Sequence, residues 1–188
     1  GWHIEEYGVT QVTMNITNIS ETPLHLAFDE TAKAANARGI RATGSELVGL
    51  LPKSAMLEAG KYFLRKQNRS TGIHESELIK IAIKSMGLDE LGPFIPEERI
   101  IEYMLESGKE KKLVDLSLTD FANETASESP APGGGSISAY AGALGISLAT
   151  MVANLSAHKR GWDERWEEFS DWADQGQVLK DELLFLVD

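Results

Sequence analysis

The sequence contains no cysteine among its 188 residues. This absence excludes a disulfide framework, a thiolate nucleophile and any zinc or iron–sulfur site built on cysteine, and it fits a reducing compartment. The four histidines show no metal-ligand spacing, so we expect them to be surface or packing residues and we expect no metal site. They are His3, His25, His74 and His158.

Positive charge is also scarce. The chain has 18 Lys and Arg against 29 Asp and Glu, a net charge of −11. A protein this acidic repels a phosphate backbone, which excludes general nucleic-acid binding. No Lys or Arg occurs between Leu113 and His158, and residues 107–188 carry a net −7 against −4 for residues 1–106. This change in charge along the sequence indicates that the chain has two parts.

Neither end of the chain carries a recognisable signal. Gly1-Trp2 is not followed by a basic and then apolar leader, so we expect no signal peptide and a cytoplasmic location. The last residues, Leu183–Asp188, form a helical run without a stop signal. We therefore expect a piece of a longer protein, with apolar surface exposed where the rest is missing.

Residues 1–106 have a mixed pattern that predicts an α+β fold. Apolar residues alternate with polar ones at Trp2–Ile4 and again at Val12–Ile16, which is typical of an antiparallel hairpin. Further along, helical spacing alternates with short stretches that resemble strands. We expect helices at 22–39, 52–64 and 76–86, and extended segments at 40–50 and 93–106.

Residues 107–112 contain no apolar side chain and have the composition of a linker. We place a domain boundary there and predict that residues 113–188 are entirely helical. The expected helices are 113–125, which Thr119 caps, 137–155, and 162–187 with a break at Gly176.

The expected helix at 137–155 has no charged residue and is almost long enough to cross a membrane. Several Ser, Thr and Asn side chains dilute its apolar character, so we interpret it as the central helix of a soluble bundle, outside any membrane. Four small residues lie along one face and predict close pairing with another helix, within a subunit or between subunits. They are Ala141, Gly145, Ala149 and Ala153.

Two polar features flank this helix. Pro132-Gly133-Gly134-Gly135-Ser136 precedes it, either as a linker with Ser136 as the cap or as a loop whose free N–H groups bind an anion. It is not a P-loop, because the lysine of that motif is missing. His158-Lys159-Arg160 follows the helix, where cations either stabilise the helix dipole or clamp a carboxylate-bearing substrate.

Longer motifs resemble two known families. Gly1–Tyr7, Gln11–Asn15, Thr22–His25 and Gly44–Pro52 are similar to the second half of the glutamate formiminotransferase domain. Leu88, Pro93-Phe94 and Ile100–Tyr103 extend that likeness. Ser127–Ser136 resembles the opening of the formiminotetrahydrofolate cyclodeaminase domain. The resemblance covers essentially the whole chain and places both domains in the order of bifunctional formiminotransferase-cyclodeaminases.

This resemblance implies folate chemistry in histidine breakdown. The first activity moves a formimino group from N-formiminoglutamate to N5 of tetrahydrofolate, and the second closes the product to 5,10-methenyltetrahydrofolate with release of ammonia. The co-substrate is polyglutamylated tetrahydrofolate, without a metal. The implied fold is an incomplete ferredoxin-like α/β sandwich over 1–106, then the start of an all-α helical bundle over 113–188, in a homo-oligomer.

The resemblance also implies where ligands bind. Gly133, Gly134, Gly135 and Ser136 would hold an anionic part of the folate or shape the wall of its pocket. Asn154 would contact the pterin, and Lys159 and Arg160 the glutamyl carboxylates. In the first part, Asn15, Ser45 and Glu46 would face a cleft. The family's catalytic histidine and pterin-binding stretch would precede Gly1. Its Leu-Val-Asp-X-Asp pattern starts at Leu186-Val187-Asp188, and the second Asp, which the resemblance implies is the catalytic one, would follow this chain. Asp188 matches the first Asp and is the catalytic candidate within this chain.

We therefore expect the chain to lack both activities when alone. Three other interpretations remain open. One is a methenyltetrahydrofolate cyclohydrolase-like enzyme, which the transferase-like first part argues against. The second is a non-catalytic module that binds folate polyglutamates, and the third is a structural oligomerisation fragment.

Overall fold

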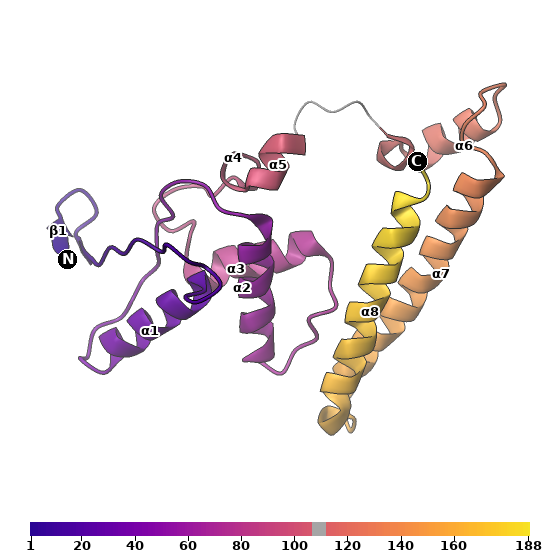
Figure 1. Cartoon of the computed structure of the whole chain (residues 1–188). Coiled ribbons are helices and arrows are strands. Elements are labelled where there is room, and N and C mark those ends of the chain that lie inside the picture. Colours follow the sequence, from indigo (N-terminus) through magenta and orange to yellow (C-terminus); the bar gives the residue numbers. More distant parts are fainter. Residues whose placement is uncertain (107–111) are drawn as a thin grey trace. The chain divides into compact units, whose positions relative to one another are not determined.

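The computed structural model describes residues 1–106 and 112–188. The predicted linker 107–112 lies outside the described residues except for Lys112. The chain divides into two compact units, Gly1–Phe63 with Ser76–Ser107, and Leu64–Glu75 with Gly108–Asp188. The first unit combines helices with a small sheet, and the second contains only helices among its described residues (Figure 1). The coarse prediction of an α+β chain is confirmed.

A short hairpin begins the first unit. β1 (Trp2–Ile4) pairs antiparallel with β2 (Val9–Gln11), and Trp2 lies opposite Gln11. The turn places Gly8 at a φ of 63°, where glycine has no Cβ to clash. The prediction of a hairpin is confirmed, but the prediction that Val12–Ile16 forms its second strand is wrong. β2 ends at Gln11, and residues 12–16 pair with no neighbouring strand, which a strand needs for its hydrogen bonds.

The core of the first unit lies among its helices. These are α1 (Leu24–Asn36), α2 (Lys53–Arg65), α3 (Glu75–Met86), α4 (Pro96–Arg99) and α5 (Ile101–Glu106). Each of the longer helices presents an apolar stripe at helical spacing, as its sequence predicts. The buried apolar cluster consists of Leu51, Met56, Ala59, Phe63, Ile79, Ala82, Met86, Leu88 and Ile100.

Two predicted extended segments are wrong in detail. Within residues 40–50 no strand forms, because the Ser45 N–H donates to the Gly87 carbonyl beyond the end of α3 (3.1 Å) and not to a neighbouring strand. The stretch 93–106 is mainly helical, since Pro96 starts α4 and the chain turns into α5 after Ile100. Only Ile100 keeps a strand-like contact, a single parallel bridge to Leu51.

The second unit is built on two long helices. α7 (Gly134–Ala157) and α8 (Trp166–Phe185) lie side by side as an antiparallel pair (Figure 1). Shorter elements surround them: η1 (Leu113–Asp115), α6 (Leu118–Thr125) and η2 (Asp163–Arg165). Ser117, not the predicted Thr119, caps α6, because its Oγ accepts the Asp120 N–H at 3.1 Å.

The face that α7 turns toward α8 is not the predicted stripe of small residues. Of that stripe only Ala153 is buried, whereas Ala141, Gly145 and Ala149 are exposed. A helix that is apolar all round has no preferred face, so the pattern along α7 cannot select its rotation. The buried residues of α7 are Ala139, Ala143, Thr150, Ala153 and Ala157.

Gly176 determines how closely the two helices approach. The predicted break at this residue is wrong, because α8 continues through it without interruption. Gly176 is buried, and a Cβ built on it would lie 2.0 Å from Thr150 Oγ1 of α7. The glycine is therefore a contact point between helices, which lets a polar threonine of α7 reach the backbone of α8.

Much of α7 remains uncovered by the described residues. By length and composition the helix could cross a membrane, and only a minor share of its apolar window is buried. The absence of a membrane partner therefore stays a prediction. Several large apolar side chains along the helix are exposed. They include Leu144, Leu148, Met151, Val152 and Leu155.

Candidate functional site

The glycine-rich segment is open to solvent at the start of α7. Gly133 is the N-cap residue and has no side chain to offer, so the N–H groups of the first turn point outward without a capping oxygen. A Cβ on Gly134 or Gly135 would contact nothing within 4 Å. Ser136 lies inside the first turn and does not serve as the cap. The segment offers backbone donors to an anion, with free space in front of them.

Asn154 lies near the other end of the same helix. At about 1.5 Å per residue, the 20 residues from Gly134 to Asn154 span about 30 Å, so one small ligand cannot contact both directly. Both polar atoms of the Asn154 amide already have partners. Its Oδ1 accepts the Ser70 hydroxyl at 2.6 Å, and its Nδ2 donates to the Gly72 carbonyl at 2.7 Å.

The basic cluster lies in the turn that follows α7. Lys159 and Arg160 are exposed, and the Lys159 ammonium lies 4.4 Å from the centre of the Trp162 ring. Partial burial and the nearby positive charge of Arg69 lower the pKa of His158, so this histidine adds no cation at neutral pH. The structure therefore places two exposed cations next to Asn154 in the chain, at the opposite end of α7 from the glycines.

Sequence analysis missed a third cation in this turn. The Arg165 guanidinium lies 4.8 Å from the centre of the Phe169 ring and forms a two-pronged ion pair with Glu168 at 2.8 and 3.1 Å. Trp162 stacks on Phe169 with a centroid distance of 5.2 Å. The signal in the sequence is the spacing of aromatic and basic residues over 159–169.

Asp188 binds the backbone at the start of the second unit. Its carboxylate accepts the Leu113 N–H at 2.7 Å and pairs with the Lys112 ammonium at 3.2 Å. Its side chain therefore holds η1 against the end of α8. Nothing in this geometry tests the predicted catalytic role, which stays a prediction.

The three candidates of the first unit have different surroundings. The Ser45 hydroxyl donates to the Met86 carbonyl at 2.8 Å, which ties the loop before α2 to the end of α3. Asn15 and Glu46 are exposed. Ser45 thus has a structural role in addition to any contact with a ligand.

The first unit also contains a buried polar cluster that sequence analysis did not single out. His25 stacks against Tyr62 with a centroid distance of 4.5 Å, and the Tyr62 hydroxyl donates to Asp29 at 2.7 Å. His25 and Asp29 lie one turn apart on α1, and both are buried. We had expected His25 to be a surface or packing residue, and the structure shows that it is packed.

This burial predicts a pH dependence of stability. Burial lowers the pKa of His25, although Glu58 and Asp29 act in the opposite direction, and its Nδ1 has no hydrogen-bond partner among the described residues. The unfolded chain therefore binds this proton more readily than the folded chain. The free energy of unfolding of the first unit should fall as the pH drops from roughly 7.5 to 5.5, through the unfolded pKa of about 6.5.

His25→Phe keeps a ring against Tyr62 and removes the titrating group. Urea denaturation of both proteins at pH 5.5 and 7.5 would test the expectation. The variant should lose less stability than the wild type when the pH is lowered. An equal loss in both proteins would show that other groups control the acid response.

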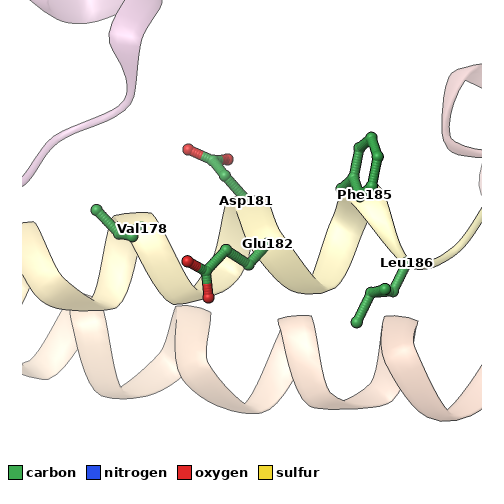
Figure 2. A pocket seen from close by; sticks show the side chains of 5 residues that line it. All are labelled: Val178, Asp181, Glu182, Phe185 and Leu186. Atoms are coloured by element: carbon green, nitrogen blue, oxygen red, sulfur yellow. The ribbon is translucent and has the colours of Figure 1, made fainter.

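Two surface hollows among the described residues are not lined by the predicted site residues. One lies along α8, where Val178, Asp181, Glu182, Phe185 and Leu186 project from neighbouring turns (Figure 2). The other is in the first unit, beside Tyr103. Within residues 1–106 and 112–188, no group of three or more His, Asp or Glu side chains is arranged to hold a metal ion.

Comparison with known proteins gives two family matches in sequence order. Residues 1–106 match the formiminotransferase domain, and residues 117–188 match the formiminotransferase-cyclodeaminase family. The formimidoyltransferase-cyclodeaminase of Gallus gallus is 38% identical over 189 residues, which covers 100% of this chain and 35% of the relative. The protein of the same name from Mus musculus is 40% identical over 164 residues, 87% of this chain and 30% of its own.

A relative whose name includes only the transferase activity matches only part of the chain. The glutamate formimidoyltransferase of Thermoplasma acidophilum is 31% identical over 80 residues, 42% of this chain and 26% of the relative. The chain thus spans about a third of the length of the relatives that match it most fully.

Proposed function

Because the chain belongs to the formiminotransferase domain family, we propose that it is part of a bifunctional enzyme of folate-dependent histidine breakdown. The observation that carries the proposal is the order of the matches, with a transferase domain over 1–106 and a cyclodeaminase match over 117–188 of one chain. A cyclohydrolase-like enzyme would not account for the first match. The whole enzyme would act in the cytoplasm as a homo-oligomer.

In this proposal residues 1–106 are a portion of the transferase domain, and residues 117–188 are a portion of the cyclodeaminase domain. The helices and hairpin of 1–106 would be one half of a ferredoxin-like transferase domain, which other strands of the sheet would complete. The α7–α8 pair would start the helical bundle of the cyclodeaminase. The exposed apolar side of α7 supports this, because a bundle needs a further helix on that side.

The two reactions have definite chemical needs. In the transferase step, N5 of tetrahydrofolate attacks the formimino carbon of N-formiminoglutamate and loses its proton. The bond from that carbon to the glutamate nitrogen breaks, and this nitrogen gains a proton as glutamate leaves. In the cyclodeaminase step, N10 attacks the formimino carbon and loses its proton, while the bond from that carbon to the formimino nitrogen breaks. The nitrogen leaves as ammonia after it gains a proton. A carboxylate could move both protons, and Asp188 is the candidate within this chain.

Ligand binding would use residues at both ends of α7. Lys159 and Arg160 would contact the glutamyl carboxylates of a folate polyglutamate, while Gly133–Ser136 would bind an anionic group of a ligand with backbone N–H donors. Asn154 would contact the pterin only after releasing Ser70 and Gly72. Asn15, Ser45 and Glu46 would belong to the transferase side.

The test is calorimetric titration of the chain with 5-formyltetrahydrofolate that carries one or five glutamates. Binding should tighten with the longer tail and weaken about five- to tenfold when Lys159 and Arg160 are both changed to Ala, since exposed charge pairs contribute up to about 1 kcal/mol each. The matched control changes Lys80 and Lys84 of α3 to Ala. These lysines are similarly exposed, and replacing both of them changes the net charge by the same amount as the test variant.

Two outcomes would contradict parts of the proposal. Equal binding of both ligands would overturn the glutamate contact at Lys159 and Arg160. No binding of either ligand to a folded sample would show that this part of the chain acts as a scaffold. In that case the longer relatives would hold the folate site in segments that this chain lacks.

A further inference from the structure

The boundary between the two compact units does not follow the boundary between the two family matches. Residues 64–75 lie within the formiminotransferase match of 1–106, yet they belong to the same compact unit as α7 and α8. This segment is the turn between α2 and α3.

Thr71 makes the central contacts of this turn with α8. Its N–H donates to Ser170 Oγ at 3.0 Å, and its hydroxyl donates to Asp174 Oδ2 at 2.6 Å. The two hydroxyls of Thr71 and Ser170 also lie 3.2 Å apart, within hydrogen-bond distance. Thr71 and Ser170 are 3% and 4% exposed, so these polar groups satisfy each other away from water.

The neighbours of Thr71 bind α7 and α8 together. Ser70, which is 2% exposed, donates its hydroxyl to Asn154 Oδ1 of α7 at 2.6 Å. The Gly72 carbonyl accepts two bonds, one from Asn154 Nδ2 at 2.7 Å and one from Gln177 Nε2 of α8 at 3.1 Å. Three consecutive residues of the turn thus contact two different helices through a closed hydrogen-bond network.

Gly72 also fits the surface of α8 too closely for any other residue. A Cβ built on Gly72 would lie 2.3 Å from Ala173 Cβ and 2.5 Å from the Asp174 nitrogen. Ala173 is fully buried. The contact therefore has both polar complementarity and tight packing, which distinguishes it from a loop that merely lies on a surface.

We propose that Ser70-Thr71-Gly72 is an intramolecular docking segment that couples the transferase-matched part of the chain to the α7–α8 helix pair, with Asn154 as the positioning residue on α7. The surface that receives it consists of Asn154, Ser170, Ala173, Asp174 and Gln177. A displacement of the α2–α3 turn would release the Asn154 amide, four residues before His158 of the basic turn. The coupling rests on the family match and not on folate binding.

Hydrogen exchange on the whole chain, without any folate, tests the coupling. Thr71→Val keeps the shape of the side chain and removes the hydroxyl that binds Ser170 and Asp174. We expect amide exchange to accelerate at least about tenfold in residues 69–74, and also in the parts of α7 and α8 around Asn154 and Ser170, because a buried hydrogen bond to a carboxylate is lost. Thr125→Val, which removes an exposed hydroxyl bonded within α6, is the matched control and should leave these segments unchanged.

A chemical cross-link provides a second measurement, on a variant that keeps the contacts of Thr71 with Ser170 and Asp174. The chain lacks cysteine, so Ser70→Cys with Asn154→Cys introduces only one thiol pair. This pair should react with a short bifunctional thiol reagent, whereas Ser70→Cys with the exposed Leu118→Cys should not. Fast exchange of residues 69–74 in the wild type, acceleration confined to the turn in Thr71→Val, or absence of the cross-link would each overturn the proposal.

Discussion

Gly176→Ala should destabilise the second unit by about 2–3 kcal/mol, as expected when an extra methyl group is forced into a packed interface. The methyl group would meet Thr150 Oγ1 at 2.0 Å and Thr150 Cβ at 3.1 Å. Thr150 cannot easily turn away, since it is buried and its hydroxyl donates to the Ile146 carbonyl at 2.8 Å. The two helices must therefore separate or α7 must rotate.

Tryptophan fluorescence during urea unfolding would measure this change, because three of the four tryptophans, Trp162, Trp166 and Trp172, lie in the second unit. Gly145→Ala is the control. Gly145 lies inside α7 with nothing within 4 Å of its Cβ position, so alanine there should stabilise the helix by up to about 1 kcal/mol. If Gly176→Ala proved as stable as the wild type, the close approach of α7 and α8 at this residue would be wrong.

Met56→Ala should destabilise the first unit by about 2–5 kcal/mol, the usual cost of removing a large side chain from a core that cannot collapse around the space. Met56 is fully buried in the cluster that also contains Ile79 and Ile100. Helix α2 carries it toward α3 and toward the Leu51–Ile100 bridge. Its loss would therefore loosen several elements at once.

Hydrogen exchange of amides in α2 and α3 would report this loss separately from the second unit. Met14→Ala makes the same chemical change at a side chain that is 50% exposed, and it should alter stability by less than about 0.5 kcal/mol. Equal effects of the two substitutions would show that the cluster around Met56 does not form the core of this unit.

Local patterns predicted most of the helices because the information lies in neighbouring residues. Apolar side chains at helical spacing indicated α1, α2 and α3, and the structure bounds them within a few residues of the expected ends. The hairpin at Trp2 followed from alternation and a glycine turn. The segments that failed, Val12–Ile16 and 40–50, depend on a strand partner, which no local pattern supplies.

In the candidate site, too, local patterns predicted one part of the arrangement and long-range contacts decided the other. Composition and motifs identified the glycine segment, Asn154 and the basic turn as conspicuous, and the family resemblance gave them an expected ligand. No spacing rule indicated that Asn154 would bind Ser70, which is 84 residues away in the sequence. The docking of the α2–α3 turn is a long-range contact, so only the folded chain reveals it.

The sequence by itself determined the family, the acidic and cysteine-free character, and the positions of the helices, because each of these depends on residue type or short-range spacing. The tertiary structure decided which face of α7 is buried. Since α7 is apolar all round, its own pattern favours no rotation, and the shape of α8 at Gly176 selects one. A glycine that looked like a helix break in the sequence is the position where the two helices come closest to steric contact.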